Sequence, residues 1–304
     1  MRIIPFDQLN DPYGFVRLME PAFGWVPTPR RLARWRRFDA RYREPFGFVG
    51  MEGDRPVGFV GVMDIPVRSL DRGTETIGGI HAVATDPNLC RKGISTKLFR
   101  AAHRHFRNKG YRFSFLCTYR GLVAWNLYAK LGYTDTPARL VPRAYRILDR
   151  RPGPKTRLSR KKPDTRRIDR LFREATRDRT GFTARNDNWV TMLMRTRELK
   201  PGDVLVRPGG YAFLQRGLHS VLVPELVAQD RRTCEDIVDR VLRLGKPEIV
   251  FGFVHDMTLR QVLERRGFRF RSGKYNTVMC KPLARAGFAR AFGDRFYFTA
   301  LDDF

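Results

Sequence analysis

The stretch from His81 to Phe99 carries the clearest chemical pattern, because a strand runs into a basic turn that opens a helix. Gly93 allows the backbone of this turn to approach a ligand closely, and Arg91 and Lys92 add positive charge. The free N–H groups and the dipole of a helix N-terminus bind phosphates. The residues that we expect to form a pyrophosphate site are Arg91, Lys92, Gly93, Ile94, Ser95 and Thr96.

A second motif, Leu127-Tyr128-Ala-Lys-Leu-Gly-Tyr133, lies about 35 residues further along, after one more strand, a spacing that fits a βαβ unit. A tyrosine has a reference pKa of about 10 and is protonated at neutral pH. Tyr128 therefore suits a general acid. The alternative is a tyrosine of the hydrophobic core on an amphipathic helix.

Together the two motifs resemble the GNAT superfamily of acyl-CoA transferases, whose signature V-x-x-x-P-x-x-R/Q-x-x-G-x-G/A precedes a helix ending L-Y-x-x-x-G-F/Y. Two positions depart from it, since Cys90 replaces the Arg/Gln and Ser95 the second Gly/Ala. The sequence pattern V-A-T-x-P is similar to that of the enhanced-intracellular-survival acetyltransferases, which also fuse two GNAT-like units. The residues that match are Val83, Pro87, Gly93, Leu127, Tyr128, Gly132 and Tyr133.

The resemblance implies acetyl-CoA as co-substrate and no metal. In the family, acyl-CoA lies where two parallel strands part, here the strands that end near Val83 and Cys117. A backbone N–H near Val83 would polarise the thioester carbonyl, and Tyr128 would protonate the departing thiolate. The strand residues that would contact the cofactor are Ala82, Val83 and Ala84.

The general base has several candidates. Glu75 and His81 share strand parity with Val83, so all three are expected to face one side of the sheet, unless a bulge lies between them. Asp64, on the neighbouring strand, is a third choice. The C-terminal carboxylate at Phe304 is a candidate only through the resemblance to the survival proteins.

The length of 304 residues predicts two domains. Apolar periodicity in the first half predicts two helices, a strand meander, and then strand–helix–strand–helix–strand. The second half repeats this order. We therefore expect an α/β fold with a mixed, mostly antiparallel central sheet flanked by helices, the GNAT fold, present twice. The expected divisions are a catalytic acyl-CoA-binding domain (1–148), a basic linker (149–167) and a degenerate GNAT-like domain with a C-terminal extension (168–304).

The second half lacks both chemical features. Its turn from Gln229 to Cys234 contains no glycine, and Leu263 stands where Tyr128 stands in the first half. We expect this half to keep the fold without an acyl-CoA site.

The net charge of +28, from 59 Lys and Arg against 31 Asp and Glu, attracts anions and disfavours a cationic acceptor. The predicted helix 28–42 combines arginines with aromatic residues, which suits phosphates and nucleic-acid bases. The alternative is an amphipathic helix with its arginines in water. The arginines that we expect on this surface are Arg30, Arg34, Arg37 and Arg41.

The four cysteines have no paired spacing, which argues against a CxxC zinc site and a disulfide framework. Neither a membrane span nor a signal-peptide pattern is found, so we expect a cytoplasmic protein. The predicted function is acetyl transfer from acetyl-CoA to a primary amine, neutral or anionic rather than cationic, by direct attack in a ternary complex. The alternatives are a non-catalytic GNAT scaffold that binds nucleic acid or a ribosomal surface, and a long-chain N-acyltransferase.

Overall fold

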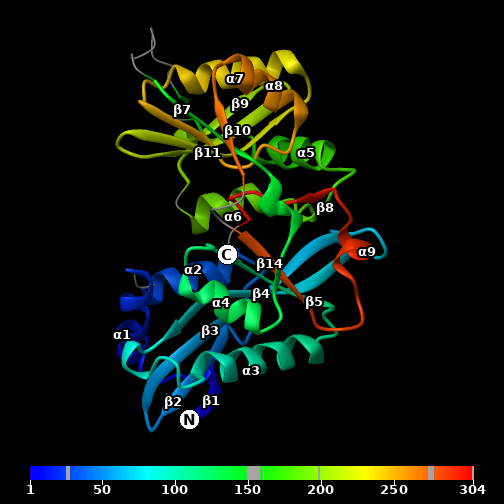
Figure 1. Ribbon diagram of the computed structural model, residues 1–304. Helices are drawn as coiled ribbons and strands as arrows, with labels where there is room; N and C mark the ends of the chain where they lie inside the picture. The colour runs from blue at the N-terminus through cyan, green and yellow to red at the C-terminus, as the bar shows by residue number, and fades with distance from the viewer. Residues whose placement is uncertain (25–27, 149–157, 160, 198, 273–276, 303–304) are drawn as a thin grey trace. The chain divides into compact units, whose positions relative to one another are not determined.

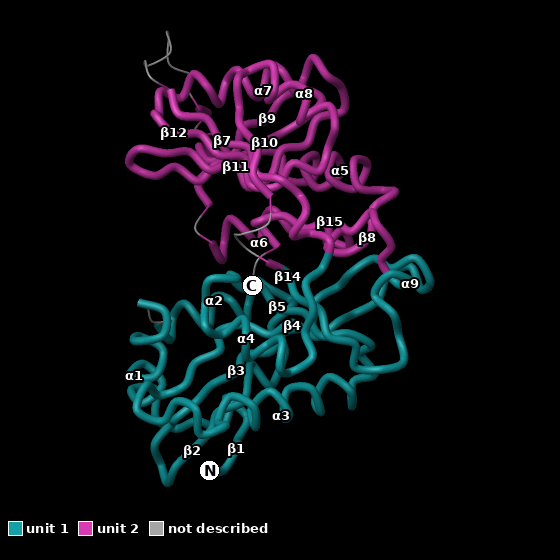
Figure 2. Tube along the Cα trace, in the orientation of Figure 1, with its two compact units in different colours: residues 1–136, 278–291, 304 teal, residues 137–277, 292–303 magenta. Residues whose placement is uncertain are grey.

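The computed structural model forms two compact units (Figure 2). Unit 1 consists of residues 1–136 and 278–291, and unit 2 of residues 137–277 and 292–303. Each unit is built on its own β-sheet. The residues that the structure describes are 1–24, 28–148, 158–159, 161–197, 199–272 and 277–302.

The sheet of unit 1 has the strand order β1-β2-β3-β4-β5-β14-β6 (Figure 1). β4 and β5 run parallel, whereas the pairs β1–β2, β2–β3, β3–β4 and β14–β6 are antiparallel. The strands are β1 (Arg2–Pro5), β2 (Gly47–Glu52), β3 (Arg55–Ser69), β4 (Gly73–Thr85), β5 (Phe113–Thr118), β6 (Thr134–Asp135) and β14 (Thr277–Pro282).

Helices cover both faces of this sheet. On α3 the apolar residues recur every four positions, and this stripe packs on one face with Val60, Val62 and Ile80. On the other face Phe15 and Leu18 of α1 pack against the strands. The helices of unit 1 are α1 (Pro12–Phe23), α2 (Pro29–Phe38), α3 (Ile94–Asn108), α4 (Val123–Lys130) and α9 (Phe288–Phe292), with 3₁₀ turns η1 (Phe6–Gln8) and η2 (Pro87–Leu89).

The sheet of unit 2 has the order β13-β7-β12-β11-β10-β9. Here β11 and β12 are the parallel pair, and the other pairs are antiparallel. The strands are β7 (Arg143–Ile147), β9 (Val204–Arg207), β10 (Gly210–Arg216), β11 (Ser220–Ala228), β12 (Glu248–Phe251) and β13 (Arg269–Arg271). Two short strands outside this order, β8 (Thr180–Gly181) and β15 (Phe296–Tyr297), form a parallel pair.

The faces of the second sheet are also covered by helices. α7 and α8 bury residues such as Val241 and Val262 in one cluster with the strands, and α5 and α6 contribute to another. The predicted mixed, mostly antiparallel sheet flanked by helices is therefore confirmed, and it occurs twice. The helices are α5 (Thr165–Ala175), α6 (Trp189–Thr196), α7 (Arg231–Leu242) and α8 (Met257–Arg265), with 3₁₀ turns η3 (Pro137–Leu140) and η4 (Pro201–Asp203).

The two halves of the sequence exchange a strand. β7 belongs to the first half of the chain, yet it lies between β12 and β13 in the sheet of unit 2. β14 belongs to the second half, yet it lies between β5 and β6 in the sheet of unit 1. The units therefore differ from the expected division at residue 148. The apolar sequence patterns of β7 and β14 predict strands, but they do not predict which partner each strand pairs with.

The end of the expected linker, 149–167, also differs from what the structure shows. Its stretches 149–157 and 160 lie outside the described residues, whereas α5 already begins at Thr165. The helix starts there because the carboxylate of Asp164 accepts a hydrogen bond from the backbone N–H of Arg167 at 3.1 Å.

The strand exchange predicts that neither half of the sequence folds alone. A fragment of residues 1–148 lacks β14, and a fragment of residues 158–304 lacks β7, so each sheet loses an internal strand and its hydrogen bonds on both sides. Expressed separately, the fragments should show no cooperative thermal transition by circular dichroism. Co-expressed, they should co-purify and melt cooperatively. A cooperative transition of fragment 1–148 alone would contradict the exchange.

Candidate active site

β4 carries a bulge at the position where it separates from its parallel neighbour. The register shifts so that Gly61 opposes His81 while Phe59 opposes Ala84, which leaves one extra residue on β4. Ala82 has a φ of 49°, in the left-handed region that residues with a Cβ rarely adopt. The β4–β5 pairing runs from Gly78 to Ile80 and stops just before the bulge. A bulge disrupts the ladder and leaves an extra residue unpaired, and here it lies beside Val83.

The bulge also changes which side chains share a face. The ring of His81 contacts those of Tyr42 and Phe46, with centroids 5.4 and 5.2 Å apart. Val83 instead packs with the cluster around α3, and Ala84 is buried in the cluster around α1. The expectation that His81 and Val83 face the same side was therefore wrong, because the extra residue reverses the alternation.

The structure does not bring Glu75 and His81 together. Six residues of strand separate them, which is a distance of about 20 Å. The carboxylate of Glu75 accepts a hydrogen bond from Nε of Arg112 at 2.9 Å, and the same guanidinium donates to Asp71. Asp64 accepts hydrogen bonds from Nζ of Lys109 at 2.9 and 3.1 Å. Glu75 and Asp64 are thus each bound to a cationic side chain. The C-terminal carboxylate of Phe304 lies outside the described residues.

His81 lies next to the bulge with one ring nitrogen unused. Its ring packs directly on Gly61, where a Cβ atom would come within 2.4 Å of the ring. Burial lowers the pKa of His81 to about 4, although a hydrogen bond to the backbone of Val62 opposes this shift. Nε2 is buried and has no hydrogen-bond partner in the described residues. The ring is therefore neutral at physiological pH, with a free lone pair.

The basic turn and α3 have the geometry of an anion site. α3 begins at Ile94, and its N-cap is Gly93 with a φ of 74° and no side-chain cap. The first backbone N–H groups of a helix have no acceptor within the helix. A Cβ at Gly93 would meet nothing within 4 Å, so the space beside the cap residue is open. Arg91 and Lys92 are exposed beside this space.

The side chains of the turn differ in what they can contact. Ile94 is buried in the core and offers only its backbone. The hydroxyls of Thr85 and Ser95 lie 2.6 Å apart in a hydrogen bond, which ties the end of β4 to the first turn of α3. Thr96 is half-buried. Cys90 is exposed, and its thiol donates to the backbone carbonyl of Asp86 at 3.6 Å.

Tyr128 is buried on α4 between the rings of Phe99 and Tyr133, at centroid distances of 5.6 and 6.4 Å. Burial raises the pKa of Tyr128 to about 12, so the hydroxyl keeps its proton at neutral pH. Within the described residues no hydrogen bond to this hydroxyl is found. The side chain has the protonation state of a general acid, and it belongs to the core cluster as well.

A buried polar network beside Tyr128 was not predicted from the sequence. The hydroxyl of Tyr133 lies 2.7 Å from Oγ of Ser114 and 2.9 Å from Nε2 of His103. Burial lowers the pKa of His103 to about 3, so its ring is neutral. This network holds Tyr133, the last residue of the motif that contains α4, in place. The sequence motif includes Tyr133, but its contacts with Ser114 and His103, which lie on other elements, have no local sequence signal.

The corresponding helix start in unit 2 is closed to anions. The carboxylate of Asp230 caps α7 and accepts a hydrogen bond from the backbone N–H of Thr233 at 2.7 Å. This bond lowers the pKa of Asp230 and keeps it charged. Leu263, the counterpart of Tyr128, is fully buried in the core of α8. A phosphate at this helix would meet a carboxylate already in place.

The basic surface around α2 is smaller than expected. The predicted helix 28–42 ends at Phe38, and Arg41 is buried in an ion pair with Asp39, at 2.7 Å between Nη2 and Oδ2. Arg36 pairs with Asp7. Arg30, Arg34 and Arg37 are exposed on α2. Arg41 was therefore wrongly placed on this surface, because the chain turns inward after the helix.

The described part of the chain holds no group of three or more His, Cys, Asp and Glu side chains placed to bind a metal ion. None of its helices has the length and apolarity needed to cross a membrane.

Comparison with known proteins finds a family model that matches the first part of the chain. Residues 13–133 match the model of the acetyltransferase (GNAT) family. No curated protein matches the sequence.

Solved structures match over most of the chain. A GCN5-related N-acetyltransferase from Kribbella flavida has a TM-score of 0.66 and 17% identity, covering 92% of this chain and 70% of that one. Eis1 from Mycobacterium abscessus has a TM-score of 0.62 and 16% identity, with 93% and 74% covered. A tandem GNAT protein from the clavulanic acid biosynthesis pathway has a TM-score of 0.55 and 12% identity, with 94% and 99% covered. These likenesses show a shared fold, and the matched model places the similarity to the acetyltransferase (GNAT) family in residues 13–133.

Proposed function

We propose that unit 1 transfers an acetyl group from acetyl-CoA to a primary amine by direct attack within a ternary complex. The observation that carries this proposal is the uncapped N-terminus of α3, which directly follows the bulged end of β4. An open set of N–H groups binds the pyrophosphate of CoA. The gap between β4 and β5 then receives the thioester at its reacting end.

The proposal gives the turn and the strand separate tasks. The backbone from Arg91 to Thr96 binds the pyrophosphate, with charge added by Arg91 and Lys92. The edge of β4 at Ala82, Val83 and Ala84 lies along the thioester arm. The N–H group near Val83 points at the oxygen that becomes negative during acyl transfer, and such a preorganised donor stabilises the transition state.

Tyr128 acts as the general acid in this proposal. A thiolate leaves as the amine attacks, and it needs a proton. The raised pKa of Tyr128 keeps its proton available at neutral pH. The Ser114–Tyr133–His103 network holds the end of the same motif in place.

Among the base candidates, the geometry favours His81. It lies beside the bulge, and its ring is neutral with a buried Nε2 that has no hydrogen-bond partner in the described residues, whereas Glu75 is bound to Arg112 about 20 Å away along the strand. A base must lie within hydrogen-bond reach of the proton that it removes, directly or through one water. We assign to His81 the removal of the proton from the attacking amine.

The acceptor is proposed to be neutral or anionic, because the net charge of +28 repels cations. Exposed Arg30, Arg34 and Arg37 on α2 would attract such an acceptor or a nucleic acid that carries it. The proposal places the protein in the cytoplasm. A non-catalytic scaffold that binds nucleic acid or a ribosomal surface is the competing function, favoured by the charge and by Cys90 at the motif position. A long-chain N-acyltransferase would use the same site with a longer acyl group.

Replacing Gly93 with Asp tests the pyrophosphate site. The variant Gly93→Asp places a carboxylate where Asp230 stands in unit 2, so acetyl-CoA binding by calorimetry should weaken by at least about 100-fold, since it loses hydrogen bonds to a charged group. Gly110→Asp is the matched control, because Gly110 has the same φ of 74° and the same open space at the other end of α3. Equal affinity in both variants would show that the site lies elsewhere.

Removing the hydroxyl of Tyr128 separates catalysis from binding. In Tyr128→Phe, kcat measured by thiol release should fall by about 10²–10⁴-fold, with the Kd of acetyl-CoA nearly unchanged. Tyr133→Phe serves as the comparison, because its hydroxyl bonds to Ser114 and His103. That variant should lower the free energy of unfolding by about 1–3 kcal/mol and reduce kcat far less. An unaltered rate in Tyr128→Phe would remove this residue from the mechanism.

The pH profile distinguishes a base of low pKa, such as His81, from a base that titrates like an exposed histidine. A histidine with a pKa of about 4 is already deprotonated at pH 5, so only the acceptor amine gains reactivity as the pH rises from 5 to 7. The logarithm of kcat/KM should therefore rise with a slope of about 1 per pH unit in this range. An exposed histidine with a pKa of about 6.5 would add a second proton and give a slope near 2 below pH 6.

The stoichiometry of acetyl-CoA tests the difference between the units. One molecule should bind per chain, because Asp230 occupies the helix start in unit 2. Two equivalent sites by calorimetry would contradict this assignment.

A further inference from the structure

The exposed face of α3 carries basic side chains and no acidic ones. Between Asp86 and Asp135 the sequence contains ten Lys and Arg residues and no Asp or Glu. Residues three and four apart on a helix lie on the same face, and four exposed basic residues follow this spacing along α3. We call them the α3 stripe: Lys97, Arg100, Arg104 and Arg107.

The charges of the α3 stripe are not balanced by neighbouring acids. Within the described residues, the side chains of Lys97, Arg100 and Arg104 form neither an ion pair nor a hydrogen bond. Arg107 donates from Nε to the backbone carbonyl of Leu283 at 3.2 Å, which leaves its charge uncompensated. Like charges at this spacing destabilise a helix. The stability of α3 therefore does not explain why these residues are basic.

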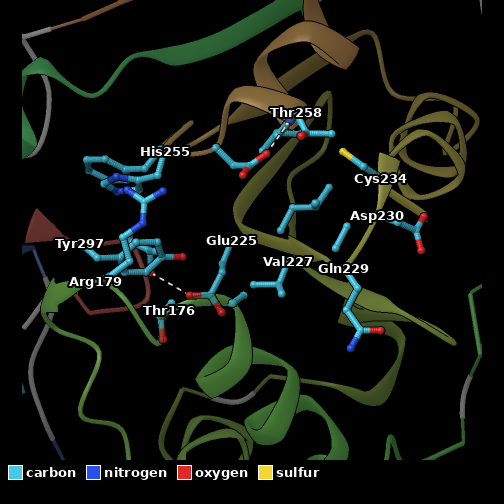
Figure 3. A pocket seen from close by; sticks show the side chains of 17 residues that line it. Thr176, Arg179, Glu225, Val227, Gln229, Asp230, Cys234, His255, Thr258 and Tyr297 are labelled. Carbon is cyan, nitrogen blue, oxygen red and sulfur yellow. Dashed lines mark hydrogen bonds between the residues drawn. The ribbon is translucent and has the colours of Figure 1, made fainter. Parts of the chain in front are cut away.

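The corresponding helix of unit 2 carries paired charges instead. α7 begins after Asp230, which lines a cavity of about 160 Å³ in this unit (Figure 3). Along α7, Arg231 pairs with Glu235 at 3.3 Å, and Arg240 pairs with Asp236 at 3.0 Å. The fold itself therefore does not require an all-basic face on the helix in this position.

The α3 stripe extends well beyond the turn of the proposed pyrophosphate site. At a rise of 1.5 Å per residue, Arg104 lies about 16 Å along the helix axis from Gly93, and Arg107 lies about 21 Å from it. A pyrophosphate held at the turn does not reach these side chains. A ligand that pairs with the whole stripe is a polyanion of at least this length.

The side chains that this face lacks distinguish between classes of polyanion. None of the exposed large apolar side chains of the described residues lies on α3, whereas protein partners and lipid surfaces are held through apolar or aromatic anchors. Phe99 and Phe106 of α3 are buried, so the face offers no aromatic ring on which an unpaired base could stack. Contacts to phosphates alone are typical of duplex binding without sequence readout.

We propose that the α3 stripe binds the phosphate backbone of a nucleic-acid duplex without sequence preference. Arginine presents several N–H donors in a geometry that matches a phosphate, and the release of counterions from the duplex drives the association. Duplex DNA and duplex RNA share this phosphate chemistry. The surface requires neither acetyl-CoA nor an acceptor amine, so it is independent of the proposed acetyl transfer.

The test measures the fluorescence anisotropy of a labelled DNA duplex of about 20 base pairs with the full chain, without acetyl-CoA, between about 50 and 200 mM NaCl. Arg100→Gln/Arg104→Gln removes two phosphate contacts. The plot of log Kobs against log salt should therefore become shallower by about 1.8, and binding at about 100 mM salt should weaken at least about 10-fold.

The matched control is Arg166→Gln/Arg170→Gln. These arginines are also exposed and four residues apart, and they lie on α5 of unit 2. This variant should keep the slope of the parent chain. Because all four substitutions replace exposed side chains, both variants should keep the thermal transition of the parent by circular dichroism.

The class of partner is tested on the parent chain. An RNA duplex of the same sequence distinguishes the two sources of phosphate, and a DNA duplex of unrelated sequence should bind as tightly as the first. Polyglutamate of about 40 residues carries as many charges as the duplex, but at about half the charge density, since an extended chain has about 3.4 Å per residue. It should bind at least about 10-fold more weakly.

Three outcomes would overturn the proposal. The first is that the two double variants change the salt slope alike, which would place the contacts elsewhere. The second is that polyglutamate binds as tightly as the duplexes, which would indicate an acidic protein as the partner. The third is that the single strand of the same sequence binds as tightly as the duplex.

Discussion

The start of α3 leaves backbone N–H groups that the helix itself cannot satisfy, and the chemistry of unit 1 depends on this fact. Among the described helices, α2, α5, α7 and α8 resolve the problem with a side chain, since Thr28, Asp164, Asp230 and Asp256 each cap one. α3 has Gly93 instead, in a left-handed conformation that glycine adopts without strain. The unsatisfied donors therefore face open space, and an anion is the natural partner for them.

The bulge in β4 lies directly before that helix start. Ala82 takes a strained φ there, and the pairing of β4 with β5 stops at Ile80. In the proposed function, the thioester of acetyl-CoA reaches into the gap beyond this point. Strain of this kind persists only where surrounding packing holds it, and the aromatic rings around His81 provide such packing. The proposed backbone donor near Val83 and the proposed anion site at the start of α3 thus belong to one strand-to-helix connection.

Local sequence patterns predicted the helices and strands well, but they could not predict the partners of two strands, β7 and β14. Periodicity is a property of neighbouring residues, so the strands at β7 and β14 were visible in the sequence. Which sheet each strand joins depends on residues more than a hundred positions away, and a mixed apolar pattern fits either sheet. The same limit applies to the site. Gly93 and Tyr128 lie in contiguous motifs, whereas the free Nε2 of His81 results from a bulge that strand parity does not reveal.

The two units show why a shared fold does not decide function. Each has a parallel strand pair that parts, a turn and a helix at the gap. In unit 1 the helix start has no side-chain cap and is flanked by Arg91 and Lys92. In unit 2 the carboxylate of Asp230 caps the corresponding helix. In the proposed function, this difference at the helix start, Gly93 or Asp230, decides which unit receives the phosphates of the cofactor, although the strands around both gaps are paired alike.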